Sequence, residues 1–233
     1  MEYSGEDNLD VMNLAHNHIQ YITDEIINAI EIINAGITEA KGKIVDFGAG
    51  NGLYAGKLQD ILGTSIVCIE PADNMMPYLK GFQTRKNIGE LTEKAGFIYS
   101  LDVLEHIEDD TSVLKQMYET MLPEGKLFLH VPAFQFLYSA MDKKVGHYRR
   151  YSRKELIAKC RSAGFRVTKC RYMDFCGFFA SVVYKYLPST DGSLNPKLLV
   201  SYDKLVIPLS RLLDKVTRGS CCGKNLILTA VKD

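Results

Sequence analysis

Residues 43–58 read KIVDFGAGNGLYAGKL and decide the fold of the chain. Ile44, Val45 and Phe47 form a short apolar run, interrupted by Asp46, that predicts a buried strand. Three glycines then occupy every second position, at Gly48, Gly50 and Gly52. Apolar residues next recur at helical spacing among polar ones, at Leu53, Leu58, Ile61 and Leu62. The stretch therefore predicts a strand, a glycine turn and a helix in succession.

The glycine turn suits a nucleotide or a cofactor that carries a carboxylate. Glycine has no Cβ, so it accepts positive φ and lets another group approach the backbone closely. A helix that begins just after the turn points its free N–H groups at whatever lies there. The alternative is a tight strand-to-helix turn that binds no ligand.

A second apolar run, SIVCIE from Ser65 to Glu70, predicts the next strand and ends in a carboxylate. An acidic residue at such a strand end, roughly 20 residues past the glycines, can accept hydrogen bonds from both hydroxyls of a ribose. The alternative is that Glu70 is an ordinary solvent-exposed charge at the end of a strand. Together with the glycine turn, Glu70 favours a cofactor that contains a ribose.

The glycine spacing is DxGxGxG, and no third glycine stands at the helix-packing position of the dinucleotide-binding GxGxxG pattern. The stretch resembles the first motif of the class I S-adenosylmethionine-dependent methyltransferases, and the similarity continues through Glu70 to SLDVLEHIEDD at residues 100–110. This resemblance implies an α/β fold with a doubly wound, seven-stranded, mostly parallel sheet whose last strand is antiparallel. It also implies S-adenosyl-L-methionine as cofactor and a small-molecule acceptor with an oxygen or nitrogen nucleophile.

The resemblance also assigns residues to the cofactor. The glycine turn would hold its amino-acid end, Asp46 would contact that end directly or through water, and Glu70 would hold the ribose. The predicted cofactor-binding residues are Asp46, Phe47, Gly48, Ala49, Gly50, Gly52, Glu70, Pro71, Ser100 and Leu101. The third strand of the family is expected at residues 87–90, where Glu90 is the candidate for reading the adenine.

Two histidines are the candidate catalytic residues, because imidazole titrates near neutral pH. His106 follows the predicted fourth strand, residues 97–101, and ligands of doubly wound sheets lie beyond the carboxyl ends of strands. Glu105 is expected to line the same cleft. His147 lies in a long loop after the fifth strand. A base is needed only if the acceptor must lose a proton, and the alternative for His106 is packing on the next helix.

The long loop, PAFQFLYSAMDKKVGHYRRYSRKEL at residues 132–156, is expected to bind the acceptor. It carries many aromatic side chains with polar tips and several guanidinium groups, and a long structureless loop in a compact domain is more often functional than not. The predicted substrate-binding residues are Tyr138, Tyr148, Arg149 and Arg150. The alternative is an ordinary solvated connection.

The chain is expected to divide into an N-terminal helical cap at residues 1–36 and a methyltransferase domain at residues 37–233. The domain would contain a helical insertion at about residues 173–223, with FCGFFASVVYKYL and LLVSYDKLVIPLSRLLDKV as its two helices. These helices are too apolar to stand free in water. They could roof an acceptor pocket, which favours a hydrophobic acceptor, form a homodimer face, touch a membrane surface or pack on the sheet.

The composition of the chain limits the partners and the compartment that are expected for it. Lys+Arg and Asp+Glu number 28 each, so the formal net charge is zero and no nucleic-acid partner is expected. The 6 cysteines form no CxxC pair or Cys/His cluster, so no metal site is predicted and free thiols fit a reducing compartment. The acidic N-terminus does not look like a signal peptide, and no apolar run is long enough to span a membrane. A cytoplasmic location is expected.

Two rival functions remain open at this stage. A nicotinamide-dependent oxidoreductase shares the acidic strand end but expects GxGxxG and usually a parallel sixth strand. A non-catalytic S-adenosylmethionine-binding module would use the same turn as a sensor or an assembly partner. The reactive side chains of the 132–156 loop favour an enzyme over such a module.

Overall fold

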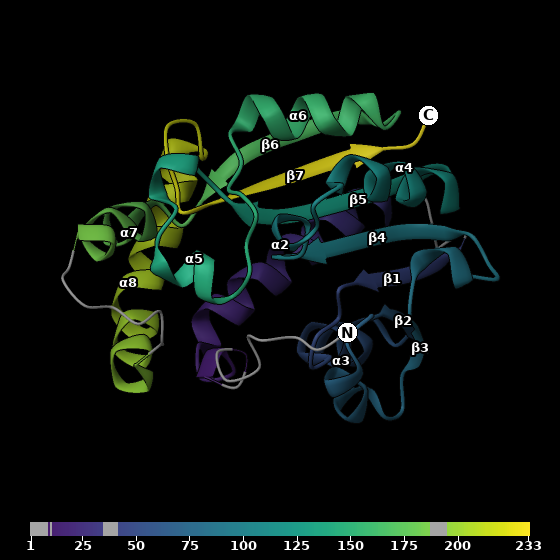
Figure 1. The fold of residues 1–233 in the computed structure, drawn as a ribbon, viewed down its shortest axis with the longest axis horizontal. Helices are drawn as coiled ribbons and strands as arrows, with labels where there is room; N and C mark the ends of the chain where they lie inside the picture. Colours follow the sequence, from purple (N-terminus) through teal and green to yellow (C-terminus); the bar gives the residue numbers. More distant parts are fainter. Residues whose placement is uncertain (1–8, 10, 35–41, 187–194) are drawn as a thin grey trace.

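The computed structural model describes residue 9 and residues 11–34, 42–186 and 195–233, and it shows one seven-stranded sheet covered by helices (Figure 1). The strand order is β3-β2-β1-β4-β5-β7-β6. β7 runs antiparallel to both of its neighbours, and the other pairs are parallel. The strands are β1 Lys43–Phe47, β2 Ile66–Ile69, β3 Gln83–Arg85, β4 Ala95–Leu101, β5 Met121–Pro132, β6 Arg166–Met173 and β7 Asn225–Val231. The predicted doubly wound sheet with an antiparallel last strand is confirmed.

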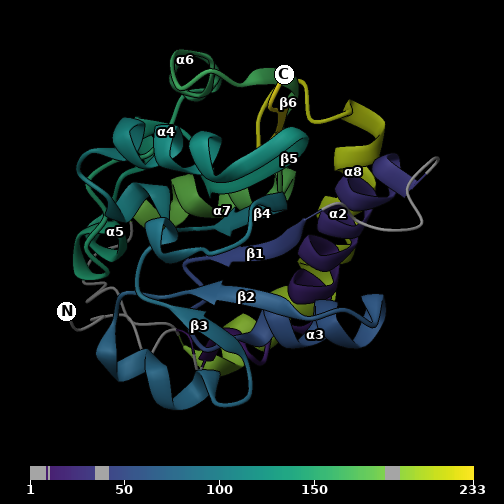
Figure 2. The ribbon, with the colours of Figure 1, turned by 90° about the vertical axis from the view of Figure 1, so that its right-hand side faces the viewer.

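Each face of the sheet packs against its own helices (Figures 1 and 2). α4 (Asp110–Thr120) and α6 (Arg153–Ser162) cover one face, where their side chains join a core with Val45 and Phe47 of β1. α2 (His16–Asn34) and α3 (Leu53–Leu62) cover the other face, where Ile44 lies. Successive side chains of β1 point to opposite faces, and both faces are covered, so apolar residues occupy neighbouring positions such as Ile44 and Val45.

Two local expectations were wrong. The third strand lies at Gln83–Arg85, and residues Ile88–Glu90 form a short 3-10 turn instead of a strand. The 132–156 loop is not structureless, because it contains a 3-10 turn at Gln135–Leu137 and the short helix α5 (Ala140–Lys144). The predicted boundary between residues 36 and 37 lies outside the described residues.

The predicted insertion contains two helices, α7 (Phe175–Tyr186) and α8 (Pro196–Thr217). α8 packs against α7 and α2 at one end of the sheet, on the left in Figure 1. Ile207 of α8 enters the core that α2 forms with the sheet. Among the described residues, no helix combines the length and apolarity that crossing a bilayer requires.

Candidate active site

The glycine turn between β1 and α3 has the backbone that its sequence predicts. Gly48, Gly50 and Gly52 have φ values of 82°, 53° and 75°, in the left-handed region that favours glycine. A Cβ at Gly48 would overlap Val103, which follows β4, so the turn lies directly against the carboxyl end of that strand. Among the described residues, a Cβ at Gly50 would meet only Leu9, at 3.5 Å. The turn is therefore tight on the β4 side and more open at Gly50.

Glu70, just beyond β2, points back into this turn. Its Oε2 accepts a hydrogen bond from the Gly50 amide at 2.8 Å, and its Oε1 accepts one from the Ala72 amide at 2.9 Å. The side chain is buried, with 6% of its surface exposed. A carboxylate offers about four lone-pair sites, so both oxygens keep acceptor capacity for a ligand hydroxyl. Glu70 thus lies beside the glycine turn, where the ribose prediction needs it.

Asp46 is the last residue but one of β1, on the face that carries α2 and α3, and it is buried. Burial, together with the nearby charge of Glu70, raises the pKa of its carboxyl from 3.8 to about 7. The folded protein therefore keeps the Asp46 proton up to a pH at which the unfolded chain has long lost it. Because the folded state binds the extra proton, stability falls as pH rises from about 4 to about 7.

Asp46→Asn is expected to remove part of this pH dependence. The wild type should lose about 2 kcal/mol of unfolding free energy through Asp46 between pH 5.5 and pH 7.5, whereas the amide cannot titrate. Urea denaturation at the two pH values measures the difference. Asp60→Asn, at an exposed position of α3, is the control and should follow the wild type. An Asp46→Asn variant with unchanged pH dependence would show that Asp46 is already ionised at pH 5.5.

Several buried polar groups near the carboxyl edge of the sheet have no hydrogen-bond partner among the described residues. They are the Ser100 hydroxyl on β4, the Glu105 carboxyl, the His130 Nε2 on β5 and the Arg150 Nη1. Leu101 pairs with His130 in the sheet, so the ends of β4 and β5 lie side by side. Buried polar groups are normally paired, and such orphans indicate a ligand, an ion or a water. The residues present therefore fit a polar cofactor beside the glycine turn.

His147 is held by a buried carboxylate in the 132–156 loop. Its Nδ1 lies 2.8 Å from Asp142 Oδ1, and Arg150 donates two hydrogen bonds to the same carboxylate, at 2.8 and 2.9 Å. Burial opposes ionisation, but the hydrogen bonds from His147 and Arg150 hold the pKa of Asp142 well below its usual range. An ionised carboxylate only accepts hydrogen bonds, so Nδ1 of His147 is the donor, and in the neutral tautomer that has this donor the lone pair is on Nε2.

The Nε2 of His147 lies 3.9 Å from Oε1 of Glu105, whose side chain is fully buried. Burial and the nearby Asp102 raise the pKa of Glu105 well above its usual range. The ring of His106 meets that of His147 edge-on, at 4.6 Å between centroids. Burial and His147 lower the pKa of His106 to about 4. The two predicted histidines therefore come together beside the buried Glu105.

The same three side chains have the geometry to hold a metal ion. One ligand atom each from Glu105, His106 and His147 lies within 4.8 Å of the other two. The spacing of these residues in the chain is far from the usual zinc patterns, so the sequence predicted no such site. A carboxylate must be deprotonated to bind a metal ion, and the raised pKa of Glu105 opposes that step.

The predicted substrate-binding side chains mostly hold the loop in place. Arg149 donates to Asp110 Oδ2 at 3.0 Å and to the Glu108 carbonyl at 2.8 Å, which ties the loop to the start of α4. Tyr138 donates to the carbonyl of His147 at 2.6 Å. Tyr148 is 55% exposed. Of this set, Arg150 alone combines burial with an unpartnered donor, its Nη1.

Sequence reasoning missed a second histidine–carboxylate pair. His130 Nδ1, near the end of β5, lies 3.0 Å from Asp102 Oδ1, just beyond β4. The sequence holds a signal for this pair, since both residues stand near the carboxyl ends of predicted strands. A histidine inside the apolar run KLFLHV is typical of a core position, so the sequence alone does not single out His130.

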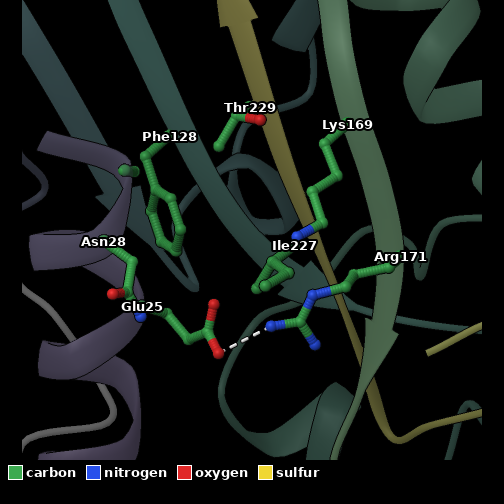
Figure 3. Close-up of a pocket in the computed structure, with 8 residues that line it drawn as sticks. Glu25, Asn28, Phe128, Lys169, Arg171, Ile227 and Thr229 are labelled. Carbon is green, nitrogen blue, oxygen red and sulfur yellow. Dashed lines mark ion pairs between the residues drawn. The ribbon is translucent and has the colours of Figure 1, made fainter. Parts of the chain in front are cut away.

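A separate small cavity of about 60 Å³ lies on the sheet face beneath α2 (Figure 3). It is lined by Glu25, Asn28, Ala29, Phe128, Lys169, Arg171, Ile227 and Thr229. Glu25 and Arg171 form an ion pair across it at 2.6 Å. The cavity has room for only a few water molecules and contains no residue of the glycine turn, so it is distinct from the cofactor site.

Comparison with known proteins agrees with this geometry. Residues 14–169 match the model of a family described as a methyltransferase domain. A ubiquinone biosynthesis O-methyltransferase from Xanthomonas axonopodis pv. citri (strain 306) is 23% identical over 164 residues, which cover 59% of this chain and 68% of that protein.

Two solved structures share the fold. An S-adenosylmethionine-dependent methyltransferase from Archaeoglobus fulgidus superimposes with a TM-score of 0.58 at 15% identity, covering 92% of this chain and 94% of that one. Phosphoethanolamine N-methyltransferase 2 from Haemonchus contortus, in complex with S-adenosyl-L-methionine, has a TM-score of 0.55 at 16% identity, covering 88% of this chain and 52% of that one. The family match spans most of the chain and includes the glycine turn and Glu70. The chain therefore belongs to this methyltransferase domain family and is an S-adenosylmethionine-dependent methyltransferase.

Proposed function

We propose that the chain transfers a methyl group from S-adenosylmethionine to an oxygen or nitrogen atom of a small, apolar acceptor, with His147 as the general base. One observation carries the proposal. The imidazole of His147, oriented by an ionised Asp142, has its Nε2 at 3.9 Å from a fully buried Glu105, at the carboxyl edge where the glycine turn also lies.

The cofactor would lie along the β1 and β2 strand ends. The turn residues Gly48 to Gly52 would hold its amino-acid end together with Asp46, and Glu70 would accept from its ribose hydroxyls. Phe47, Ala49, Pro71, Ser100 and Leu101 complete the proposed binding set. Glu90 is a weaker candidate for the adenine, because its carboxylate already accepts from Lys86 N and Asn87 Nδ2 of its own turn.

When bound, S-adenosylmethionine supplies a methyl group on a cationic sulfur, a chemistry that depends mainly on alignment. The chain supplies the proton acceptor. His147 Nε2 would take the proton of the acceptor, and Asp142 would stabilise the imidazolium through its hydrogen bond to Nδ1. Arg150 would fix Asp142 and present its unpartnered Nη1 to the acceptor.

An aromatic cluster beside the loop favours an apolar acceptor. Phe134 stacks on Tyr172 of β6 at 4.8 Å and meets Phe178 of α7 edge-on at 5.3 Å. Phe136 also meets Phe178, at 6.1 Å. These rings join the 132–156 loop to the insertion, so both segments would line the acceptor site. One relative carries a name from ubiquinone biosynthesis, and the acceptor proposed here is of the same broad, apolar kind.

Titration calorimetry and a transfer assay test the proposal together. The purified protein is expected to bind S-adenosylmethionine with a micromolar Kd and to show no heat with NAD. Incubation with methyl-labelled cofactor should then label a compound in the organic phase of a cell extract. Binding without any labelled product would favour a non-catalytic module, and labelling confined to the aqueous phase would contradict the apolar acceptor.

A further inference from the structure

The outward face of α8 carries a continuous apolar stripe. Five large apolar side chains are more than half exposed, at Leu198, Leu205, Leu209, Leu212 and Val216. Their spacings of seven, four, three and four residues place them on one side of the helix. Isolated exposed leucines are common, but a stripe along a 22-residue helix indicates a surface that another body covers.

The charges of α8 are sorted by sign between its two sides. Lys197, Lys204 and Lys215 are exposed, whereas both acidic residues of the helix, Asp203 and Asp214, are buried at 2% exposure. No carboxylate of α8 therefore reaches the exposed face, which is apolar and cationic.

The two buried aspartates have specific partners inside the protein. Asp203 accepts from the backbone amides of Asn17 and His18 at the start of α2, at 2.9 and 2.8 Å. Asp214 accepts from the Asp174 amide at 2.7 Å and from the Tyr21 hydroxyl at 2.9 Å. These bonds fix the rotation of α8 about its axis, so the apolar and basic side is held outward.

α7 extends the same kind of surface. Phe179, Val183 and Tyr186 are 51%, 62% and 77% exposed, and they recur at spacings of four and three residues. The helix contains Lys185 and no acidic residue. α7 packs against α8 at the outer end of the sheet (Figure 1).

We propose that the exposed faces of α7 and α8 dock on the surface of an anionic lipid bilayer. A helix with a large apolar face and a cationic flank lies in the plane of a membrane interface, with its apolar side among the acyl chains and its lysines near the headgroups. The whole chain has 28 basic and 28 acidic residues, so its net charge does not attract it to an anionic membrane. The electrostatic attraction to the lipid headgroups would come from the lysines of this face alone. Such docking is peripheral and would bring the active site to acceptors dissolved in the lipid.

Co-sedimentation with vesicles tests this surface without any acceptor or cofactor. The protein is expected to bind vesicles that contain phosphatidylglycerol at least tenfold more tightly than vesicles of phosphatidylcholine alone, and salt should weaken the binding. Lys204→Glu with Lys215→Glu should lower the affinity at least about 25-fold, since each basic residue near an anionic surface contributes about fivefold. Leu205→Gln with Leu212→Gln should abolish the binding.

The matched control is Lys115→Glu with Lys154→Glu, which makes the same charge change at exposed positions of α4 and α6. This variant should bind vesicles like the wild type. An equal loss in the control, or equal binding to neutral vesicles, would overturn the proposal. A solution dimer that dissociates in the leucine variant would also overturn it, because the face would then bind a second copy. Unchanged melting temperatures confirm that these exposed substitutions leave the fold intact.

Discussion

Replacing Glu70 with alanine is expected to weaken the binding of S-adenosylmethionine about 100-fold. Hydrogen bonds to a charged group contribute about 1.5–3 kcal/mol each, and water in the vacated space recovers only part of two such bonds. The variant also frees the Gly50 amide that Glu70 now holds at 2.8 Å, so the glycine turn loses a support. Titration calorimetry at equal ionic strength measures the change in Kd.

Two further variants separate the possible causes of that loss. Glu70→Gln keeps one carbonyl oxygen for a backbone amide and loses the charge, so an intermediate loss of about tenfold is expected. Glu90→Ala alters the acidic residue beyond β3, whose carboxylate already serves its own turn, and should change the Kd no more than about twofold. Unchanged affinity in Glu70→Ala, with the fold intact, would remove the ribose role and the main support for the cofactor position.

Glu70 and the glycine turn could be predicted because their signals are local. A buried strand, a run of glycines and a helix occupy consecutive residues, and the next strand end follows within one βαβ unit. β3 was misplaced for the opposite reason. It is a three-residue strand, QTR, and none of its side chains is fully buried, so no apolar pattern marks it.

The contacts of the 132–156 loop were harder to predict, because each depends on the fold of a distant segment. The sequence predicts Arg149 as a substrate-binding residue, but in the structure its guanidinium binds Asp110, which lies 39 residues earlier in the chain. Asp142 and His147 are only five residues apart, and that pair could have been proposed from the sequence. The sequence also could not predict what α8 packs against. Its periodicity indicates that the helix has an apolar side, but it does not show whether the sheet or another body covers that side.

Replacing His147 with alanine is expected to lower kcat between about 100-fold and 10,000-fold and to leave the Kd for S-adenosylmethionine unchanged. A positioned general base contributes about that factor when the acceptor must lose a proton. The side chain lies in the loop after β5 and does not belong to the proposed cofactor-binding set, so cofactor binding should survive its loss. Asp142 keeps Arg150 as a partner in the variant, which protects the fold.

The measurement is a pH profile of turnover on the acceptor that the extract assay identifies. In the wild type, kcat should fall on the acidic side of the profile, where a general base is protonated. Asp142→Asn removes the charge that stabilises the imidazolium, so kcat should drop and the acidic limb should move to lower pH, with KM little changed. A merely structural role of Asp142 would not move that limb.

His106→Ala is the matched comparison, because its ring lies against that of His147. With a pKa of about 4, His106 is a weak proton acceptor near pH 7, so its loss should lower kcat only a few-fold. A large fall in His106→Ala together with normal turnover in His147→Ala would transfer the role of base to His106. Normal turnover in both variants would mean that the acceptor reaches the methyl group already deprotonated, and alignment alone would then account for the catalysis.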